Sequence, residues 1–169
     1  MIIVSNTSPI SNLIIIGEVS LLQQIYPKVL IPPAVHLELT RLPIFQPTMT
    51  SLLSAGWLEI QAPTNLQLLD TLNQTLDPGE AEAIELAVEL STDREQRDEV
   101  VRLLIDERLG RNVAASYGLK LRGLLGILIN AKQQGLIPVL KPILDRLISQ
   151  AGFRVSQSLY DRTLQEVGE

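Results

Sequence analysis

The chain has 169 residues and a formal net charge of −5, with 46% hydrophobic and 20% charged residues. This composition excludes disorder, because so much apolar sequence can bury a core. The absence of cysteine and the presence of only one histidine exclude disulfide scaffolds, thiolate catalysis, Cys-ligated metal centres and His-rich metal sites. No apolar run approaches the roughly 18 residues of a membrane span, and the start of the chain lacks a basic segment, so we expect a cytoplasmic protein without membrane contact.

Short apolar runs alternate with longer helical patterns, which is typical of an α/β protein with a parallel sheet. Strands are predicted at 1–4, 29–31, 57–61, 100–105 and 119–121, and helices at 9–16, 33–41, 47–55, 66–76, 78–90, 108–117, 124–134, 139–150 and 157–167. Ser8 is expected to cap the first helix, with Pro9 at its first position. The polar stretch 91–99 is interpreted as an inserted loop. Without repeats or long linkers, the chain is predicted to form a single domain over residues 1–169.

Polar side chains follow two of the predicted strands. Ser5, Asn6, Thr7 and Ser8 come directly after the first strand, and Asp106 comes after the fourth. In open parallel sheets, ligands bind beyond the carboxyl ends of the strands. These residue types are also common in turns and helix caps, so turn formation is the competing explanation.

The helix predicted to begin at Pro33 has an acidic residue on its apolar face. Val35, Glu38 and Leu39 share that face, which places Glu38 toward the core. An unpaired carboxylate is costly there. The sequence therefore predicts a partner for Glu38, either an arginine or a bound cation.

Glu80 has a similar position at the start of the next long helix. Glu80 shares one face of this helix with the apolar residues Ile84 and Ala87. Glu82, Glu85 and Glu89 lie on the opposite face and are expected to be solvated. A capping box beginning at Asp77 would explain an acidic residue at position 80, but capping does not explain why that residue faces the core.

Glu38, Glu80 and Asp106 are thus three carboxylates at element ends, each aimed toward the end of the first strand. A cluster of oxygen ligands selects a hard cation, Mg²⁺ or Mn²⁺. Such a site supports metal-assisted attack of water on a phosphodiester. Phosphate-binding and dinucleotide-binding glycine motifs are absent from the sequence.

Charge is distributed unevenly along the chain. Residues 1–107 contain 15 acidic and 5 basic residues, whereas residues 108–144 contain 6 basic residues and no acidic residue. The basic stretch is predicted to form an RNA-facing surface that includes Arg108 and Arg111. The alternative is that a stretch rich in Gly and Leu simply has few acidic residues.

Five sequence blocks, in order, resemble the PIN-domain superfamily. They are Ile3 to Ile10, Val29 to Leu39, Leu76 to Ile84, Leu104 to Glu107, and Gly123 to Leu128. The chain resembles most a prokaryotic branch of that superfamily often found near toxin–antitoxin genes, and VapC-type toxins are the best-known relatives. The resemblance covers nearly the whole chain.

The resemblance implies a Rossmann-like α/β/α sandwich with a central parallel sheet and a Mg²⁺- or Mn²⁺-dependent ribonuclease site. It also implies a homodimer and an antitoxin partner. The family's acidic positions correspond to Asn6, Glu38, Glu80 and Asp106, with Glu82 as the second choice for the third position, and its hydroxyl positions correspond to Thr7 and Ser8.

Asn6 departs from the family pattern, which has Asp at the end of the first strand. An amide oxygen can still bind a metal, but the site loses one negative charge. Two hypotheses follow. The first is a metal-dependent ribonuclease, the toxin of a toxin–antitoxin pair, and the second is a catalytically degraded PIN-like module that binds RNA or a protein.

Overall fold

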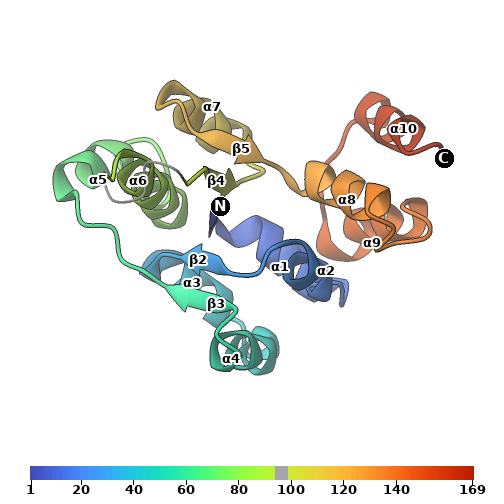
Figure 1. Cartoon of the computed structure of the whole chain (residues 1–169), viewed down its shortest axis with the longest axis horizontal. Helices are drawn as coiled ribbons and strands as arrows, with labels where there is room; N and C mark the ends of the chain where they lie inside the picture. Colours follow the sequence, from blue (N-terminus) through green and yellow to red (C-terminus); the bar gives the residue numbers. More distant parts are fainter. Residues whose placement is uncertain (94–98) are drawn as a thin grey trace.

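A five-stranded parallel sheet forms the centre of the molecule (Figure 1). The computed structural model describes residues 1–93 and 99–169. The strands are β1 (Ile2–Ser5), β2 (Val29–Ile31), β3 (Leu58–Ile60), β4 (Val101–Leu104) and β5 (Lys120–Arg122), in the order β3-β2-β1-β4-β5. All four pairings are parallel, as the alternation of short apolar runs with helices predicts.

Helices cover both faces of this sheet. They are α1 (Thr7–Ile15), α2 (Ser20–Ile25), α3 (Pro33–Thr40), the 3-10 turn η1 (Pro43–Phe45), α4 (Gln46–Ser54), α5 (Leu66–Leu72), α6 (Pro78–Thr92), α7 (Arg108–Ser116), α8 (Leu124–Gln133), α9 (Lys141–Ala151) and α10 (Gln157–Glu166). The architecture is the predicted α/β/α sandwich. Within the described ranges, no helix combines the length and apolarity that a bilayer crossing requires.

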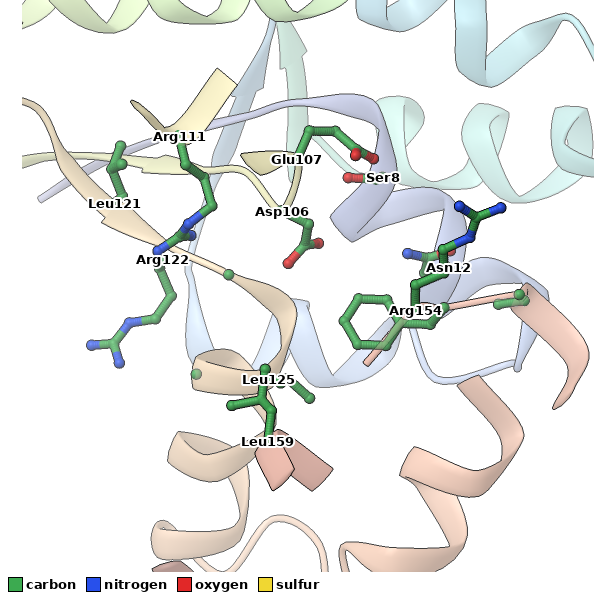
Figure 2. Close-up of a pocket in the computed structure, with 15 residues that line it drawn as sticks. Ser8, Asn12, Asp106, Glu107, Arg111, Leu121, Arg122, Leu125, Arg154 and Leu159 are labelled. Carbon is green, nitrogen blue, oxygen red and sulfur yellow. The ribbon is translucent and has the colours of Figure 1, made fainter. Parts of the chain in front are cut away.

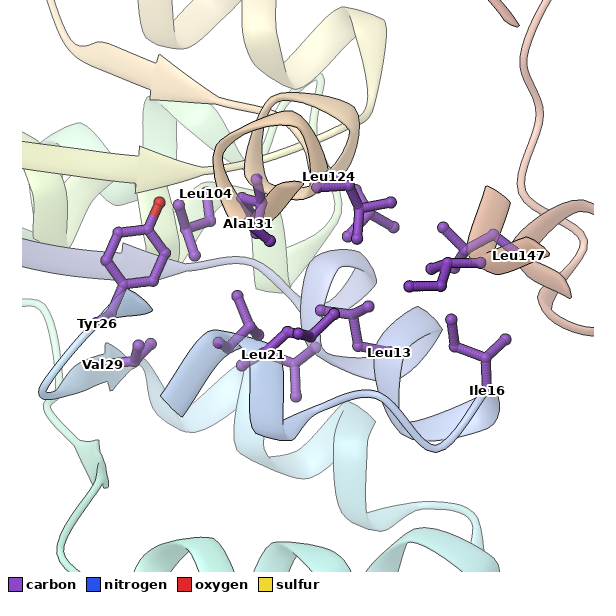
Figure 3. Close-up of a cluster of buried hydrophobic side chains, with 14 of the residues drawn as sticks. Leu13, Ile16, Leu21, Tyr26, Val29, Leu104, Leu124, Ala131 and Leu147 are labelled. Carbon is purple, nitrogen blue, oxygen red and sulfur yellow. The ribbon is translucent and has the colours of Figure 1, made fainter. Parts of the chain in front are cut away.

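Two apolar cores lie on opposite faces of the sheet. Because successive strand residues point to opposite sides, Ile3 and Leu104 belong to one core, and Val4 and Leu103 belong to the other. The first core also receives side chains from α1, α2, α8 and α9 (Figure 3). The second is closed by α5, α6 and α7. The β1 and β4 strands are therefore fixed from both sides.

Some element boundaries differ from those predicted from the sequence. Helix α1 begins at Thr7, with Asn6 at its N-cap position, so the prediction that Ser8 caps this helix was wrong. Helix α5 ends at Leu72 rather than 76, and the six-residue helix α2 was not predicted. Helix α6 continues to Thr92, and residues 94–98 of the expected insertion lie outside the described residues.

The strand order brings the site residues to one edge of the sheet. From β1 the chain crosses to β2 on one side, and it later returns to β4 on the other, which creates the switch point where such sheets bind ligands. The Asn6 N–H donates to the Leu104 carbonyl at 2.9 Å, so β1 and β4 end together. Helix α6 precedes β4 in this parallel arrangement, and its first turn therefore also lies at the carboxyl edge.

Candidate metal site at the carboxyl edge of the sheet

Asn6 presents a free oxygen at the end of β1. It occupies the N-cap position of α1, but its side chain makes no capping hydrogen bond. The residue is only 4% exposed, and its Oδ1 has no hydrogen-bond partner among the described residues. Turn and cap formation therefore do not account for this side chain, and a buried acceptor without a partner is costly.

Glu38 reaches across from α3 to α1 and α6. The Thr7 hydroxyl donates to Glu38 Oε2. A Cβ built on Gly79 would lie 2.6 Å from Glu38 Oε1, so glycine at that position admits the carboxylate. No ion pair to Glu38 occurs within residues 1–93 and 99–169, which leaves the arginine explanation without support there.

Glu80, in the first turn of α6, is buried, and its carboxylate lies against α7. Asp77 Oδ1 caps α6 by accepting from the Glu80 N–H at 2.8 Å, while Glu80 Oε1 has no partner in the described chain. Burial raises the pKa of Glu80 to about 7, and the carboxylates of Asp77, Glu107 and Glu38 add to the increase. A Cβ on Gly110 would lie 2.6 Å from Glu80 Oε1.

Asp106 is held in position through one carboxylate oxygen. Its Oδ1 accepts from the Leu124 N–H at 2.7 Å, and its Oδ2 is buried without a partner among the described residues. Burial raises the pKa of Asp106 to about 6, although the Leu124 N–H and the Arg111 guanidinium oppose the increase. One oxygen thus fixes the side chain and the other stays free.

These carboxylates form two neighbouring groups rather than one closed cluster. Glu38 and Glu80 interact electrostatically on one side, whereas Asp106 lines a separate cavity. Within the described part of the chain, no three His, Cys, Asp or Glu side chains lie close enough to hold a metal ion. Glu107 raises the pKa of both Glu80 and Asp106. Sequence reasoning missed Glu107, and its position directly after Asp106 was the available signal.

Of the other acidic residues of α6, Glu85 contradicts the prediction of solvent exposure, whereas Glu82 and Glu89 are half-buried and accept hydrogen bonds. Glu82 Oε2 accepts from the Ala34 N–H at 2.8 Å, and Glu89 accepts from the Thr64 N–H. Glu85 is fully buried. The prediction failed because α3 and α5 also pack against α6, so its second face is covered as well.

An open cavity of about 810 Å³ adjoins Asp106 (Figure 2). Ser8, Glu107 and Arg111 line it beside Asp106. Arg111 donates from Nη1 to the Ile105 carbonyl at 2.8 Å. Ser8 therefore joins the Asp106 group, and Thr7 joins the Glu38 group. Arg108 lies exposed at the first residue of α7, outside the cavity lining.

Residues 2–169 match the family model of the PIN domain. The chain belongs to the PIN-domain family. No significant match was found among curated proteins or among solved structures. The family match and the parallel sandwich agree with the resemblance in the sequence blocks.

The residues of this PIN domain fit a divalent cation in their chemistry. Asn6 Oδ1, Glu80 Oε1 and Asp106 Oδ2 are buried oxygens without partners among the described residues. They are amide and carboxylate oxygens, the type that Mg²⁺ and Mn²⁺ prefer. A cation would satisfy atoms that the described residues leave unsatisfied, and it would offset the burial and the repulsion that together raise the pKa of Glu80.

Proposed function

We propose that this PIN domain is a Mg²⁺- or Mn²⁺-dependent endoribonuclease. The observation that carries the proposal is the set of three buried, unpartnered oxygens on Asn6, Glu80 and Asp106 at one edge of the sheet. Turns, caps and ion pairs within the described residues use none of these atoms. A cation is the ligand that gives all three a common role.

Each residue has a distinct part in the proposed site. A bound divalent cation polarises a phosphodiester and lowers the pKa of an attacking water. Asn6, Glu80 and Asp106 would supply ligand oxygens to the cation. Glu38, whose Oε2 accepts from the Thr7 hydroxyl, would supply a further oxygen if the cation draws the two groups of carboxylates together. Arg111 stands beside Asp106 with N–H groups left over for a phosphate oxygen.

The proposed cellular role follows from the family resemblance. As the toxin of a toxin–antitoxin pair, the protein would act on cytoplasmic RNA as a homodimer, restrained by an antitoxin. The match to the PIN family over residues 2–169 supports the nuclease class. The toxin role is tested by arrest of growth on expression and by its relief on co-expression of an adjacent gene.

A specific observation favours the second candidate function, a catalytically degraded module that binds RNA or a protein. Asn6 supplies no charge where the PIN pattern has a carboxylate, and no three acidic side chains converge within the described residues. A site with fewer charges binds a divalent cation more weakly, and it then activates water less well.

The substitution Asn6→Asp separates the two functions. It adds a fourth carboxylate with almost no change in shape. Without metal, it should lower the Tm, because another anion joins buried acidic groups. Added Mn²⁺ should restore the Tm, because it raises the free energy of unfolding by about 2.7 kcal/mol when its concentration is 100 times the Kd. Cleavage of a labelled RNA should increase in parallel.

Asn112→Asp is the matched control, because Asn112 is exposed on α7 and the substitution adds the same charge. It should change neither the Mn²⁺ response nor the cleavage rate. If Asn6→Asp gives neither metal-dependent stabilisation nor cleavage, the nuclease proposal fails and the binding module replaces it.

A further inference from the structure

A second acidic group lies on α6, beyond the turn that carries Glu80. Glu85 is fully buried, and neither of its carboxylate oxygens has a hydrogen-bond partner among the described residues. Glu89 lies one turn further along the same face of the helix, and its charge acts on Glu85. The proposed nuclease site uses neither residue, so this buried carboxylate has no role there.

The segment before α5 lies against these two side chains. Glu89 Oε2 accepts from the Thr64 N–H at 2.9 Å. The neighbouring Asn65 N–H opposes the increase in the pKa of Glu85, but it lies outside hydrogen-bonding geometry. Helix α5 itself packs along α6 (Figure 1). The pair therefore lies between α6 and the start of α5, and it can be reached from the surface because Glu89 is only half-buried.

No positive charge balances this pair within the described residues. Neither Glu85 nor Glu89 forms an ion pair there, and the last turn of α6 has no basic residue. A helix C-terminus carries a negative partial charge, so the carboxylate of Glu89 is in an unfavourable place. Protonation of Glu85 would remove one charge, but it would leave both of its oxygens without partners. The charge and the unsatisfied oxygens both indicate a bound cation.

We propose that Glu85 and Glu89 bind a hard divalent cation, Mg²⁺ or Ca²⁺, at a site separate from the one that includes Asn6. Two carboxylates offer up to four oxygens, the type of ligand that both ions prefer, and water completes the coordination shell. The cation offsets the cost of burying Glu85 and joins α6 to the segment before α5. Because no third acidic side chain lies close enough among the described residues, we expect weak binding, with a Kd of roughly 0.1–1 mM. The inference does not depend on the ribonuclease function.

The test first removes two ligands of the proposed nuclease site, so that the second site can be measured alone. Urea unfolding of a Glu80→Gln/Asp106→Asn protein is followed at pH 8, above the pKa of Glu85 of about 7. The protein is treated with EDTA, transferred to metal-free buffer, and then measured in Mg²⁺ or in Ca²⁺, with KCl keeping the ionic strength constant. At about 10 mM, a cation that binds should raise the ratio of folded to unfolded protein roughly tenfold or more.

Glu85→Gln, added to the same protein, is the deciding variant. It keeps the size of the side chain and removes its charge, so the cation-dependent increase should disappear. Glu89→Gln should reduce the increase, because it removes the charge of the second ligand. Glu166→Gln is the matched control, since Glu166 is exposed on α10 and its substitution should leave the increase unchanged. Each variant is compared with itself in metal-free buffer, so that its own effect on stability cancels.

Each outcome decides the proposal. It is overturned if neither cation stabilises the Glu80→Gln/Asp106→Asn protein, or if Glu85→Gln leaves the increase as large as Glu166→Gln does. An increase that requires Glu85 supports it, and a response to Ca²⁺ alone assigns the site to the larger ion, which tolerates irregular coordination. The nuclease proposal is judged separately, by RNA cleavage in the protein that keeps Glu80 and Asp106.

Discussion

Glu80 and Glu85 lie five residues apart on α6 and share a physical problem. Both are buried, and burial raises the pKa of each to about 7. Both have an oxygen without a partner among the described residues. They differ in what lies nearby, because Glu80 faces Glu38 and Glu107 at the carboxyl edge, whereas the charge that acts most on Glu85 is that of Glu89. The pKa of Glu85 is therefore raised first by burial and then by Glu89, away from the carboxyl edge.

Replacing Glu85 by Gln should make stability less dependent on pH. Between the usual pKa of about 4.5 and the folded value of about 7, the folded state keeps a proton that the unfolded state has lost. Stability therefore decreases as pH rises through this window. At pH 8, Glu85→Gln should raise the free energy of unfolding by about 2–3 kcal/mol. At pH 4.5 it should change little.

Urea denaturation at the two pH values measures this difference. Glu166→Gln is the control, since Glu166 is exposed on α10 and should show no pH-dependent gain. An equal effect of Glu85→Gln at pH 4.5 and pH 8 would mean that its carboxylate does not titrate in this range.

At the scale of elements, glycines set how closely the helices approach at the site. Gly79 in α6 leaves space for Glu38 of α3, and Gly110 in α7 leaves space for Glu80 of α6. In each case, a glycine on one helix leaves room for a carboxylate that comes from a neighbouring helix. The packing of α3, α6 and α7 is therefore adapted to buried acidic groups.

This adaptation predicts a change of sign in a double-mutant cycle. In the wild type, Gly79→Ala should lower the free energy of unfolding by about 1–2 kcal/mol, because the new Cβ meets the Glu38 carboxylate. In a Glu38→Ala background the same substitution should raise it by about 0.5–1 kcal/mol, the usual gain of Ala over Gly in a helix. Thermal or urea unfolding of the four proteins gives both values. The same sign in both backgrounds would contradict the contact.

The sequence predicts most helices and strands, but it does not predict everything that packs against them. The inward direction of Glu38 and Glu80 can be predicted from the spacing of apolar residues, because each of their helices has an apolar stripe that faces the sheet. Periodicity failed for Glu85 because α6 is covered on a second face, which one helix's pattern does not encode. Phe153 and Arg154 also line the cavity beside Asp106. They were missed because a turn after α9, not a repeat in the sequence, brings them there. Helix α2 has only six residues, too few to show a helical spacing of apolar residues, and no side chain caps it.

At the scale of the whole molecule, one arginine connects segments that are far apart in the sequence. Arg146 of α9 donates from Nη1 to the Ile16 carbonyl at 2.9 Å and pairs with Glu18 at 2.5 Å. These contacts join the segment after α1 to the helix that leads into Phe153. The position of the cavity wall thus depends on contacts across about 130 residues of chain.

Removing this connection should destabilise the fold modestly. Arg146→Ala should lower the free energy of unfolding by about 1 kcal/mol, because the Ile16 carbonyl and Glu18 lose a charged donor. Lys141→Ala, on the same helix, removes an exposed ion pair with Asp145 and should cost less than Arg146→Ala. Equal losses in urea denaturation would contradict a special role for Arg146.

The strand order also has a consequence for protein synthesis. β1 is made first, yet its neighbour β4 begins about a hundred residues later, at Val101. A chain that has emerged from the ribosome only as far as α6 already contains Asn6, Glu38 and Glu80, but it lacks Asp106 and the strand that closes the sheet. If the protein is a ribonuclease, a chain that ends before Asp106 lacks one of the proposed metal ligands, and no activity is expected from it.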